Sequence, residues 1–494
     1  MRSWRTGTLL TVILTICTIW VTSPALAGFA PEPLFPFVQK QKIGFIDKSG
    51  KVVIPPKFAF SGNGYSVFKP TDKLLPQAIG TVSDSKWGFI DRTGKFVIAP
   101  QFDYVAPFED GISKVGFIDG QRELYIDETG RSLFPAHTVL GSFDDHGLAM
   151  TADYAGFHNG YDVYTYNFVN RNGELVSDVP LAGADEFTEG YAAANMGGKS
   201  KRMWGAPRGG KWGFIDTGGN WVIDSTFSYA LPFSEGYAGV AVGGVSSPDD
   251  PDGASVFPRG AKWGFIDKTG AVVIKPQFQE VGSFSNGLAP AKSNNKWGLI
   301  DKSGAFVIKP QFQEIQPFSN GAAPAKRNNK WGLIDKTGKF IAQPTYIKLR
   351  RIQNDMYVFP ADPDYNQYGI LTKTGRVIGS NFTSVGQDFS EGLLTVGWKD
   401  SGAFLNAKGQ FFLRRTGVRY GDFVSGFAGY YSLKNRLAGF IDRNGKTITQ
   451  PVYANYAPFS YGLALVVTRD AKGNEFDAYI DTTGRTIWKS KIPR

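Results

Sequence analysis

A repeat of 34 residues sets the tightest limit on how this chain can fold. The segment Lys-Trp-Gly-(Phe/Leu)-Ile-Asp begins at Lys262 and returns twice, so that Trp263, Trp297 and Trp331 follow one another at intervals of 34 residues. A fixed period of this size indicates one supersecondary element per repeat, with neighbouring repeats completing each other's core. We therefore expect an array of similar units.

Each unit carries three strand signals. Around Trp297 they fall at residues 287–291, 297–301 and 305–308. Asp301 opens a turn and Gly304 takes the left-handed position that reverses the chain between the second and third strands. Pro310 ends the third strand because it has no N–H to donate. A connector of the pattern Phe-x-x-Gly then leads to the next unit.

The Asp turn serves as an anchor that can be followed through the whole chain, because a Gly stands three residues after each anchor residue. The ninth unit is irregular, since it lacks the Phe-x-x-Gly connector. There are twelve anchors: Asp47, Asp91, Asp127, Asn170, Asp216, Asp267, Asp301, Asp335, Thr372, Asn406, Asp442 and Asp481.

These units predict an all-β fold of about twelve tandem three-stranded β-meanders over residues 28–494. Three strands of about five residues bury little by themselves, so neighbouring units must stack. No strand is left over at either end to close a ring, which favours an open or superhelical array. One or two β-propeller-like rings are the alternative.

The first 27 residues have the pattern of a signal peptide. Arg2 and Arg5 precede an apolar run from Leu9 to Val21, and Ala25-Leu26-Ala27 forms a small-residue cleavage site. The run is short for a membrane span. We therefore expect an exported protein, periplasmic or extracellular, with no permanent membrane span after cleavage.

Cysteine usage and net charge limit the kinds of partner and chemistry that we expect of this chain. Cys17 is the only cysteine and lies in the predicted signal peptide, so the remaining chain has neither disulfides nor thiol chemistry. Removal of Arg2 and Arg5 lowers the formal net charge from +10 to +8. That charge suits anionic partners, and export makes nucleic acid an unexpected one.

The units differ in length mainly between their first and second strands. The longer segments are residues 70–85, 153–164, 197–210, 243–261 and 470–477. In a regular stack all of them would lie along one edge. Such insertions either form a binding face or mark a hairpin tip that tolerates extra length, and both interpretations stay open.

The motifs Lys-Trp-Gly-Phe-Ile-Asp-Lys-x-Gly, Val-Ile-x-Pro-Gln-Phe and Phe-Ser-x-Gly-Leu-Ala resemble those of the bacterial WG-repeat (KWG-repeat) proteins. The resemblance covers roughly residues 34–494 and is most specific in units six to eight. It implies a β-repeat protein of the envelope or exterior, and it supplies no catalytic residues. A looser similarity to cell-wall-binding aromatic–glycine repeats is an analogy that points to glycans.

Five Lys-Trp pairs are the candidate binding residues. Exposed tryptophan rings beside cations would form flat platforms for the sugar rings of an anionic polymer. The alternative is that a Trp recurring at one repeat position packs between neighbouring units. The pairs are Lys86-Trp87, Lys211-Trp212, Lys262-Trp263, Lys296-Trp297 and Lys330-Trp331.

Other chemistry finds little support. The anchor Asp is interpreted as a turn-former, and a repeated surface acid does not provide the paired carboxylates of a glycosidase. The spacing of His137, His146 and His158 matches no tight zinc pattern, and residues 249–253 lack the spacing of a calcium loop. No nucleophile elbow, phosphate loop or dinucleotide fingerprint occurs. We expect no catalytic residues, no metal and no cofactor.

The sequence therefore predicts a non-enzymatic binding or interaction scaffold in the cell envelope, acting on a protein partner. The alternative is a binder of cell-wall polysaccharide or another anionic polymer through the Lys-Trp pairs. Buried tryptophans would favour the first and exposed ones the second. A hydrolase among the insertions would require a convergent acid pair.

Overall fold

A computed structural model describes residues 31–60, 67–81, 84–117, 122–134, 139–140, 143–158, 161–199, 207, 209–244 and 257–490. Almost every regular element in this part of the chain is a β-strand. Its single helical element is a 3-10 turn, η2 (Gln353–Asp355). The predicted all-β class is therefore confirmed. The predicted signal peptide lies outside the described residues.

The strands form twelve small antiparallel sheets in the described chain, and each sheet is a meander of consecutive strands. Four sheets have three strands: β1 (Phe35–Gln39), β2 (Lys42–Ile46), β3 (Val52–Ala59); β4 (Leu75–Thr81), β5 (Asp84–Ile90), β6 (Phe96–Phe102); β7 (Tyr104–Val105), β8 (Ile112–Phe117), β9 (Arg122–Asp127); and β10 (Val139–Leu140), β11 (Leu148–His158), β12 (Tyr161–Asn170).

The other eight sheets have four strands each. They are β13 (Gly183–Ala184), β14 (Tyr191–Met196), β15 (Lys211–Asp216), β16 (Trp221–Phe227); β17 (Tyr229–Ala230), β18 (Tyr237–Val242), β19 (Lys262–Asp267), β20 (Val272–Phe278); β21 (Glu280–Val281), β22 (Ala289–Ser293), β23 (Lys296–Ile300), β24 (Phe306–Phe312); β25 (Glu314–Ile315), β26 (Ala322–Arg327), β27 (Lys330–Asp335), β28 (Phe340–Tyr346); β29 (Arg350–Ile352), β30 (Met356–Pro360), β31 (Tyr368–Thr372), β32 (Val377–Phe382); β33 (Ser384–Val385), β34 (Leu393–Gly397), β35 (Ser401–Asn406), β36 (Phe411–Thr416); β37 (Val418–Val424), β38 (Phe427–Ser432), β39 (Ala438–Asp442), β40 (Thr447–Tyr453); and β41 (Asn455–Tyr456), β42 (Leu463–Arg469), β43 (Glu475–Asp481), β44 (Thr486–Lys489).

The prediction of twelve meanders is confirmed, and in most units the three predicted strands are the three long ones; the sheets β7–β9 and β10–β12 have two long strands each. The additional strand is a short first strand such as β21, whose residues the sequence analysis assigned to the connector. It was missed because a pairing of two residues leaves no hydrophobic period in the sequence.

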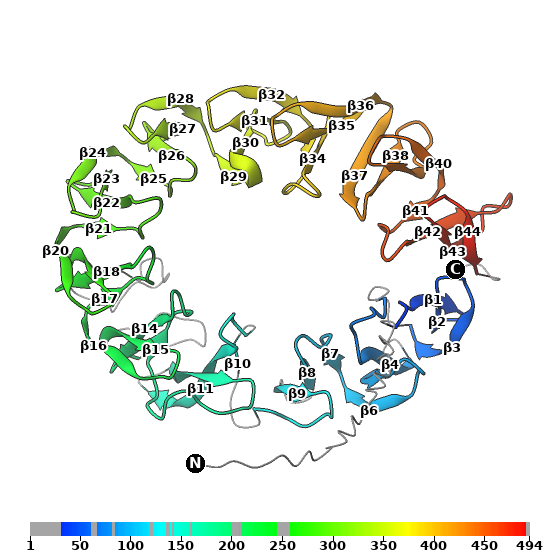
Figure 1. The fold of residues 1–494 in the computed structure, drawn as a ribbon, viewed down its shortest axis with the longest axis horizontal. Coiled ribbons are helices and arrows are strands. Elements are labelled where there is room, and N and C mark those ends of the chain that lie inside the picture. The colour runs from blue at the N-terminus through cyan, green and yellow to red at the C-terminus, as the bar shows by residue number, and fades with distance from the viewer. Residues whose placement is uncertain are drawn as a thin grey trace, which may run out of the picture.

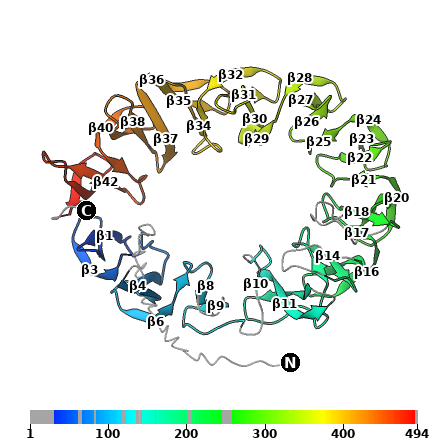
Figure 2. The same cartoon turned by 180° about the vertical axis from the view of Figure 1, so that it is seen from behind.

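The twelve sheets are arranged side by side around one ring (Figure 1, and from behind in Figure 2). In most sheets the short first strand faces the middle of the ring and the last strand lies on the outer rim. The two ends of the described chain meet, and β1–β3 stand next to β41–β44.

Direct contacts close the ring at this seam. The Phe35 and Tyr479 rings lie 5.6 Å apart, the Phe37 and Trp488 rings lie 4.9 Å apart, and the Tyr479 hydroxyl donates to the carbonyl of Pro36 over 2.7 Å. The expected open array is therefore wrong, and the single-ring alternative is correct. We number the sheets along the chain, so that sheet 1 is β1–β3 and sheet 12 is β41–β44. No spare strand is needed to close the ring, because sheet 12 packs on sheet 1 through side chains, as other neighbouring sheets do.

The core consists of layers between neighbouring sheets. A typical layer joins a Phe of one middle strand to the connector Phe of the next unit, and Phe265 and Phe284 have their ring centroids 4.8 Å apart. Both side chains are almost fully buried. The pairs Phe89–Phe108, Phe168–Phe187, Phe214–Phe233 and Phe404–Phe423 repeat the contact. This explains why Phe recurs both in the Trp-Gly-Phe motif and in the connector.

Close backbone approach explains the glycine of the Trp-Gly pair. The last strand shifts its register against the middle strand at this point, and a Cβ added to Gly298 would lie 2.4 Å from the carbonyl oxygen of Ile308. Only glycine leaves room for this crossing. The Trp-Gly pair is therefore first of all a packing motif.

The anchor turns confirm the interpretation of the anchor Asp as a turn-former. The Asp301 carboxylate accepts hydrogen bonds from the Ser303 hydroxyl (2.5 Å) and from the N–H groups of Ser303 (2.8 Å) and Ala305 (3.2 Å). The hydroxyl bond is the largest of the causes that hold the pKa of Asp301 below its ordinary value. In all twelve units the Gly N–H bonds back to the anchor carbonyl.

Candidate functional site

Each sheet has two ends of different character. The turn edge carries the connectors and the anchor turns, and the hairpin edge carries the hairpins between the first two long strands. The segments 197–210 and 243–261 follow β14 and β18 in the chain and precede β15 and β19, as predicted; their residues 200–206, 208 and 245–256 lie outside the described part of the chain. Two other predicted insertions are mainly strand, because residues 75–81 form β4 and residues 153–164 fall mostly in β11 and β12.

Charged nodes tie neighbouring units together along the turn edge. The Glu235 carboxylate accepts the Gly287 N–H of the next connector over 3.0 Å and lies 3.5 Å from the Lys302 ammonium of the next anchor turn. Glu189 does the same with Gly236 and Lys268, and Glu391 with Gly426 and Arg443. These nodes fix the register of one unit against the next.

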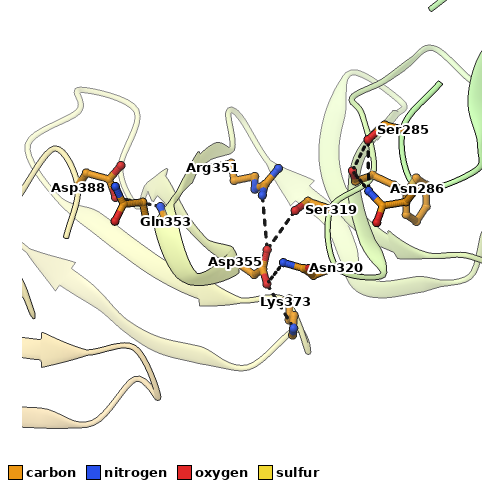
Figure 3. Close-up of polar contacts among 10 residues, drawn as sticks. Ser285, Asn286, Ser319, Asn320, Arg351, Gln353, Asp355, Lys373 and Asp388 are labelled. Carbon is orange, nitrogen blue, oxygen red and sulfur yellow. Dashed lines mark hydrogen bonds and ion pairs between the residues drawn. The ribbon is translucent and has the colours of Figure 1, made fainter. Parts of the chain in front are cut away.

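The irregular ninth unit keeps this node with its acid moved to the neighbouring connector (Figure 3). Asn320 stands where other connectors have Glu, and Asp355 stands where the next connector would have Gly, at a φ of 54°. The Asp355 carboxylate accepts from the Asn320 amide (2.8 Å), the Ser319 hydroxyl (3.2 Å) and the Lys373 ammonium (3.3 Å). Burial alone would raise the pKa of Asp355, but these donors hold it below its ordinary value.

A node of opposite polarity joins units two and three, where Lys73 lies 2.7 Å from Glu128 of the anchor turn. Sequence reasoning missed all of these nodes. The available signal was a cation directly after an anchor combined with an acid in the preceding connector. The nodes explain these charged residues of the repeat by assembly of the ring.

The structure places all five predicted tryptophans in packing positions. Trp212 and Trp263 are buried, with 3% and 1% of their surface exposed, and Trp87, Trp297 and Trp331 are half-buried. Their lysine neighbours in sequence do not share one environment. Lys86 is half-buried and lies 2.5 Å from Asp103, whereas Lys211, Lys262, Lys296 and Lys330 are exposed.

The cations over the half-buried tryptophans come from the neighbouring strand. Lys292 lies 5.7 Å from the Trp297 ring centroid and 2.5 Å from the Glu280 carboxylate. Lys326 takes the same position over Trp331 and pairs with Glu314. Units seven and eight thus each carry a row of Glu, Lys and Trp across three strands, with Lys296 and Lys330 outside it. A ladder of exposed Lys-Trp platforms is not what these contacts form.

Unit six departs from this row. Opposite Trp263 stands Ala241 in place of a lysine, and Tyr229 replaces the acid. Phe257, from the end of the long insertion, lies edge-to-face on Trp263 (5.3 Å) and on Tyr229 (5.2 Å). Tyr229 also contacts Trp212 of unit five, with ring centroids 4.9 Å apart. An aromatic cluster therefore takes the place of the ion pair.

A pocket of about 380 Å³ opens beside this cluster, between the unit-six insertion and the first strand of unit seven. Its lining residues are Phe257, Pro258, Arg259, Gly260, Ala261, Lys262, Trp263, Gln279 and Glu280. The Trp263 indole nitrogen is buried and has no hydrogen-bond partner within the described chain. A buried unpaired donor costs about 1–3 kcal/mol. We take this Trp263 pocket as the candidate functional site.

Lys262 and Trp263 were predicted binding residues and do meet in the pocket. The other eight predicted residues lie elsewhere, in the corresponding positions of units two, five, seven and eight. Sequence reasoning missed Phe257, Arg259 and Glu280. The only available signal was the length of the insertion.

Asp185, near the same cluster, has an unusual environment. Burial, together with the nearby charge of Glu186, raises the pKa of the Asp185 carboxyl to about 6. Burial, together with Asp185, also raises the pKa of the Tyr229 hydroxyl. The ionised carboxylate is therefore poorly solvated next to an aromatic layer.

Asp185→Asn should make the protein more stable at neutral pH and leave it unchanged in acid. A pKa raised from 3.8 to about 6 in the folded state means that stability falls as the pH rises between these values. Above pH 6 the penalty is about 3 kcal/mol, at about 1.4 kcal/mol per pKa unit. Urea midpoints at about pH 4 and about pH 8 measure it. Glu186→Gln, the control, should give a smaller gain, and equal midpoints for Asp185→Asn and the parent at both pH values would contradict the assignment.

Metal chemistry finds no site in the described residues, which contain no group of three His, Cys, Asp or Glu able to hold an ion. His146 lies 3.5 Å from Asp144. His137, the side chain of His158 and residues 249–253 fall outside what is described. Across the described chain, no helix has the length and apolar character needed for a membrane crossing.

Comparison with known families decides what kind of repeat this is. The family model for the WG containing repeat matches residues 43–63, 87–120, 168–199, 212–245, 263–297, 297–331, 331–359 and 439–470, about half of the chain. The chain belongs to the WG-repeat family. The resemblance noted in the sequence is thus confirmed, and with it the character of the molecule as a repeat scaffold.

No curated protein matches this WG-repeat protein. Among solved structures it is similar to a eukaryotic initiation factor, at 12% identity and a TM-score of 0.34, covering 93% of this chain and 96% of the other. It is also similar to Hsv2p of Kluyveromyces lactis, at 7% identity and a TM-score of 0.27, covering 64% of this chain and 100% of the other. At these TM-scores the two similarities carry no functional argument.

Proposed function

We propose that this WG-repeat protein is an exported, non-enzymatic scaffold that binds another protein in the cell envelope. The observation that carries the proposal is a rim of exposed apolar side chains on the last strands of the sheets. Each of these residues is 40–56% exposed. They are Val52, Val53, Val97, Val222, Val272, Val273, Val307, Val377, Phe411 and Val452.

Most of these side chains stand directly before a buried residue of the same strand. Val97 and Val307 precede Ile98 and Ile308, which are buried between the sheets. Packing of the sheets therefore accounts for the isoleucines and leaves the valines to solvent. Apolar groups repeated along a surface mark places where proteins associate, because association removes them from water.

The same strands are protected against pairing with other strands. Several of them contain proline, which withdraws an N–H from the free edge of the sheet. The prolines are Pro56, Pro100, Pro276, Pro310, Pro344 and Pro451. A partner would therefore bind through side chains of the rim, with no strand added to a sheet.

Export is supported by the sequence alone, through the signal-peptide pattern of residues 1–27. The absence of cysteine after Cys17 is compatible with an oxidising compartment, where a free thiol would be a liability. Scaffold function without catalysis is supported by the assembly roles found for the repeated acids and aromatics.

A photo-crosslinking amino acid at position 307 should trap a discrete partner in intact cells. Val307 lies on the rim and is 48% exposed, while Val242, similarly exposed at 47%, lies at the hairpin edge and is the matched control. We expect an adduct from position 307 and none from position 242. The double variant Val273→Lys/Val307→Lys should lose the partner, because two charges would be buried in an apolar contact.

The same sample checks export. The mature chain recovered from the envelope fraction should begin at Gly28. Equal adducts from positions 242 and 307, or no adduct at all, would overturn the rim as a binding surface. Recovery of the chain from the cytoplasm with residues 1–27 attached would overturn export.

A second candidate function, binding of a wall glycan or another anionic polymer, is favoured by one observation. None of the five predicted tryptophans is exposed, so they do not form an extended ladder of Lys-Trp platforms on the surface. The Trp263 pocket nevertheless combines aromatic walls with cations in one concave place.

A further inference from the structure

The Trp263 pocket has the size and lining of a small-ligand site. Its volume of about 380 Å³ lies within the range of about 300–1,000 Å³ that ligand pockets occupy. Its aromatic wall consists of Phe257, half-buried, and Trp263, buried beneath it. Polar groups reach it from both sides, from the unit-six insertion and from Gln279 and Glu280 at the start of unit seven.

The Trp263 indole provides an unused hydrogen-bond donor. Its side chain lines the pocket and is 1% exposed, and its nitrogen has no partner within the described chain. Elsewhere in the ring, Trp398 of the hairpin between β34 and β35 donates its indole N–H to Asn381 over 3.1 Å. At Trp263 the missing acceptor is one that a ligand in the pocket can supply.

The charges of the pocket favour an anion. Arg259 and Lys262 are exposed side chains that form no ion pair within the described residues. Glu280, on the opposite wall, is neutralised by Lys292 at 2.5 Å. Two cations are thus left for a ligand, and a guanidinium beside an ammonium suits a carboxylate.

The other groups that line the pocket favour a sugar as the ligand over a simple anion. The Glu280 carboxylate and the Gln279 side chain can accept hydrogen bonds from hydroxyl groups, although each already holds a protein partner. Aromatic side chains offer an apolar surface to the C–H face of a sugar ring. A phosphate or acetate ion would use the cations and leave the other groups idle.

We propose that the Trp263 pocket is a binding site for one carboxylated sugar residue, a uronic acid or its equivalent in an anionic polysaccharide. Arg259 and Lys262 hold the carboxylate, the Trp263 indole N–H donates to a ring or hydroxyl oxygen, and Glu280 accepts from a hydroxyl group. The site is separate from the rim, so it stands or fails independently of the proposed protein partner.

Calorimetric titration of the purified protein with glucuronate, glucose and acetate tests the assignment. Glucuronate should bind. Glucose and acetate should each bind at least about tenfold more weakly, because glucose lacks the carboxylate and acetate lacks the sugar ring. Arg259→Gln and Lys262→Gln should each weaken glucuronate binding about tenfold, through loss of a charge-assisted hydrogen bond. Trp263→Phe keeps an aromatic ring without the N–H and should weaken binding by a smaller factor.

Lys296→Gln and Trp297→Phe are the matched controls, because they change the same repeat positions in unit seven, outside the pocket. Both should bind glucuronate like the parent protein. Should Trp263→Phe fail to fold, as judged by circular dichroism, the two exposed cation variants still decide the question. No heat with glucuronate, equal binding of acetate, or equal losses in the unit-seven controls would each overturn the proposal. A uronic acid polymer binding where the monomer does not would overturn the single-residue site and return the interaction to general charge attraction.

Discussion

Phe37→Ala combined with Tyr479→Ala should open the ring at the seam while the remaining sheets stay folded. Both side chains are buried where sheet 1 meets sheet 12. Tyr479 packs on Phe35 at 5.6 Å and donates its hydroxyl to the Pro36 carbonyl, and Phe37 packs on Trp488. Truncation of a buried aromatic side chain costs about 3–5 kcal/mol.

We expect the seam to be the weakest junction of the ring because no covalent connection crosses it. It is the one junction between neighbouring sheets that the chain does not cross, since the first and last strands of the described chain meet there. Like the junction at Asn286, it has no charged node of this kind among the described residues, because Tyr461 stands where Glu235 stands in its connector. Lys48 of the first anchor turn instead lies 3.4 Å from Glu32.

Small-angle scattering should therefore report a larger radius of gyration for the double variant at unchanged mass. Hydrogen exchange should show lost protection in β1–β3 and β41–β44 and retained protection in β21–β28. Tyr461→Phe, which removes only an exposed hydroxyl beside the seam, is the control and should leave the ring closed. A double variant that keeps its radius, or that loses protection in all sheets together, would contradict a weak seam.

Local chemistry made much of the fold predictable from the sequence. An Asp that binds the N–H groups two and four residues later, followed by a Gly with positive φ, specifies the same reversal wherever it occurs, as at Asp301 and Gly304. The hairpins and the number of units followed from that turn.

Long-range contacts explain what the sequence left open. Closure of the ring depends on residues such as Pro36 and Tyr479, more than 440 positions apart, and no local pattern reports their meeting. The Trp263 pocket depends on Phe257 folding back from an insertion and on Ala241 standing where unit seven has Lys292. The motif around Trp263 and Trp297 is the same, so their different surroundings could not be read from the motif itself.

Phe265→Ala should produce the largest local loss of stability, about 3–5 kcal/mol, because it removes a fully buried ring from the layer between two sheets. The ring contacts Phe284 of the next connector, so the loss falls on β17–β20 and β21–β24 together. Contacts in a repeat protein join adjacent units, and distant units keep their own layers. Hydrogen exchange should show reduced protection in those two sheets first and near-parent protection in β33–β36.

Val307→Ala is the control for this experiment, since an exposed rim residue should change stability by less than about 0.5 kcal/mol. The two substitutions compare a buried apolar residue of the repeat with an exposed one. Phe265 holds neighbouring sheets together, and Val307 faces solvent, where the proposed partner would bind. A uniform loss of protection around the ring on Phe265→Ala would mean that closure makes the twelve sheets one cooperative unit, and would contradict the local coupling argued here.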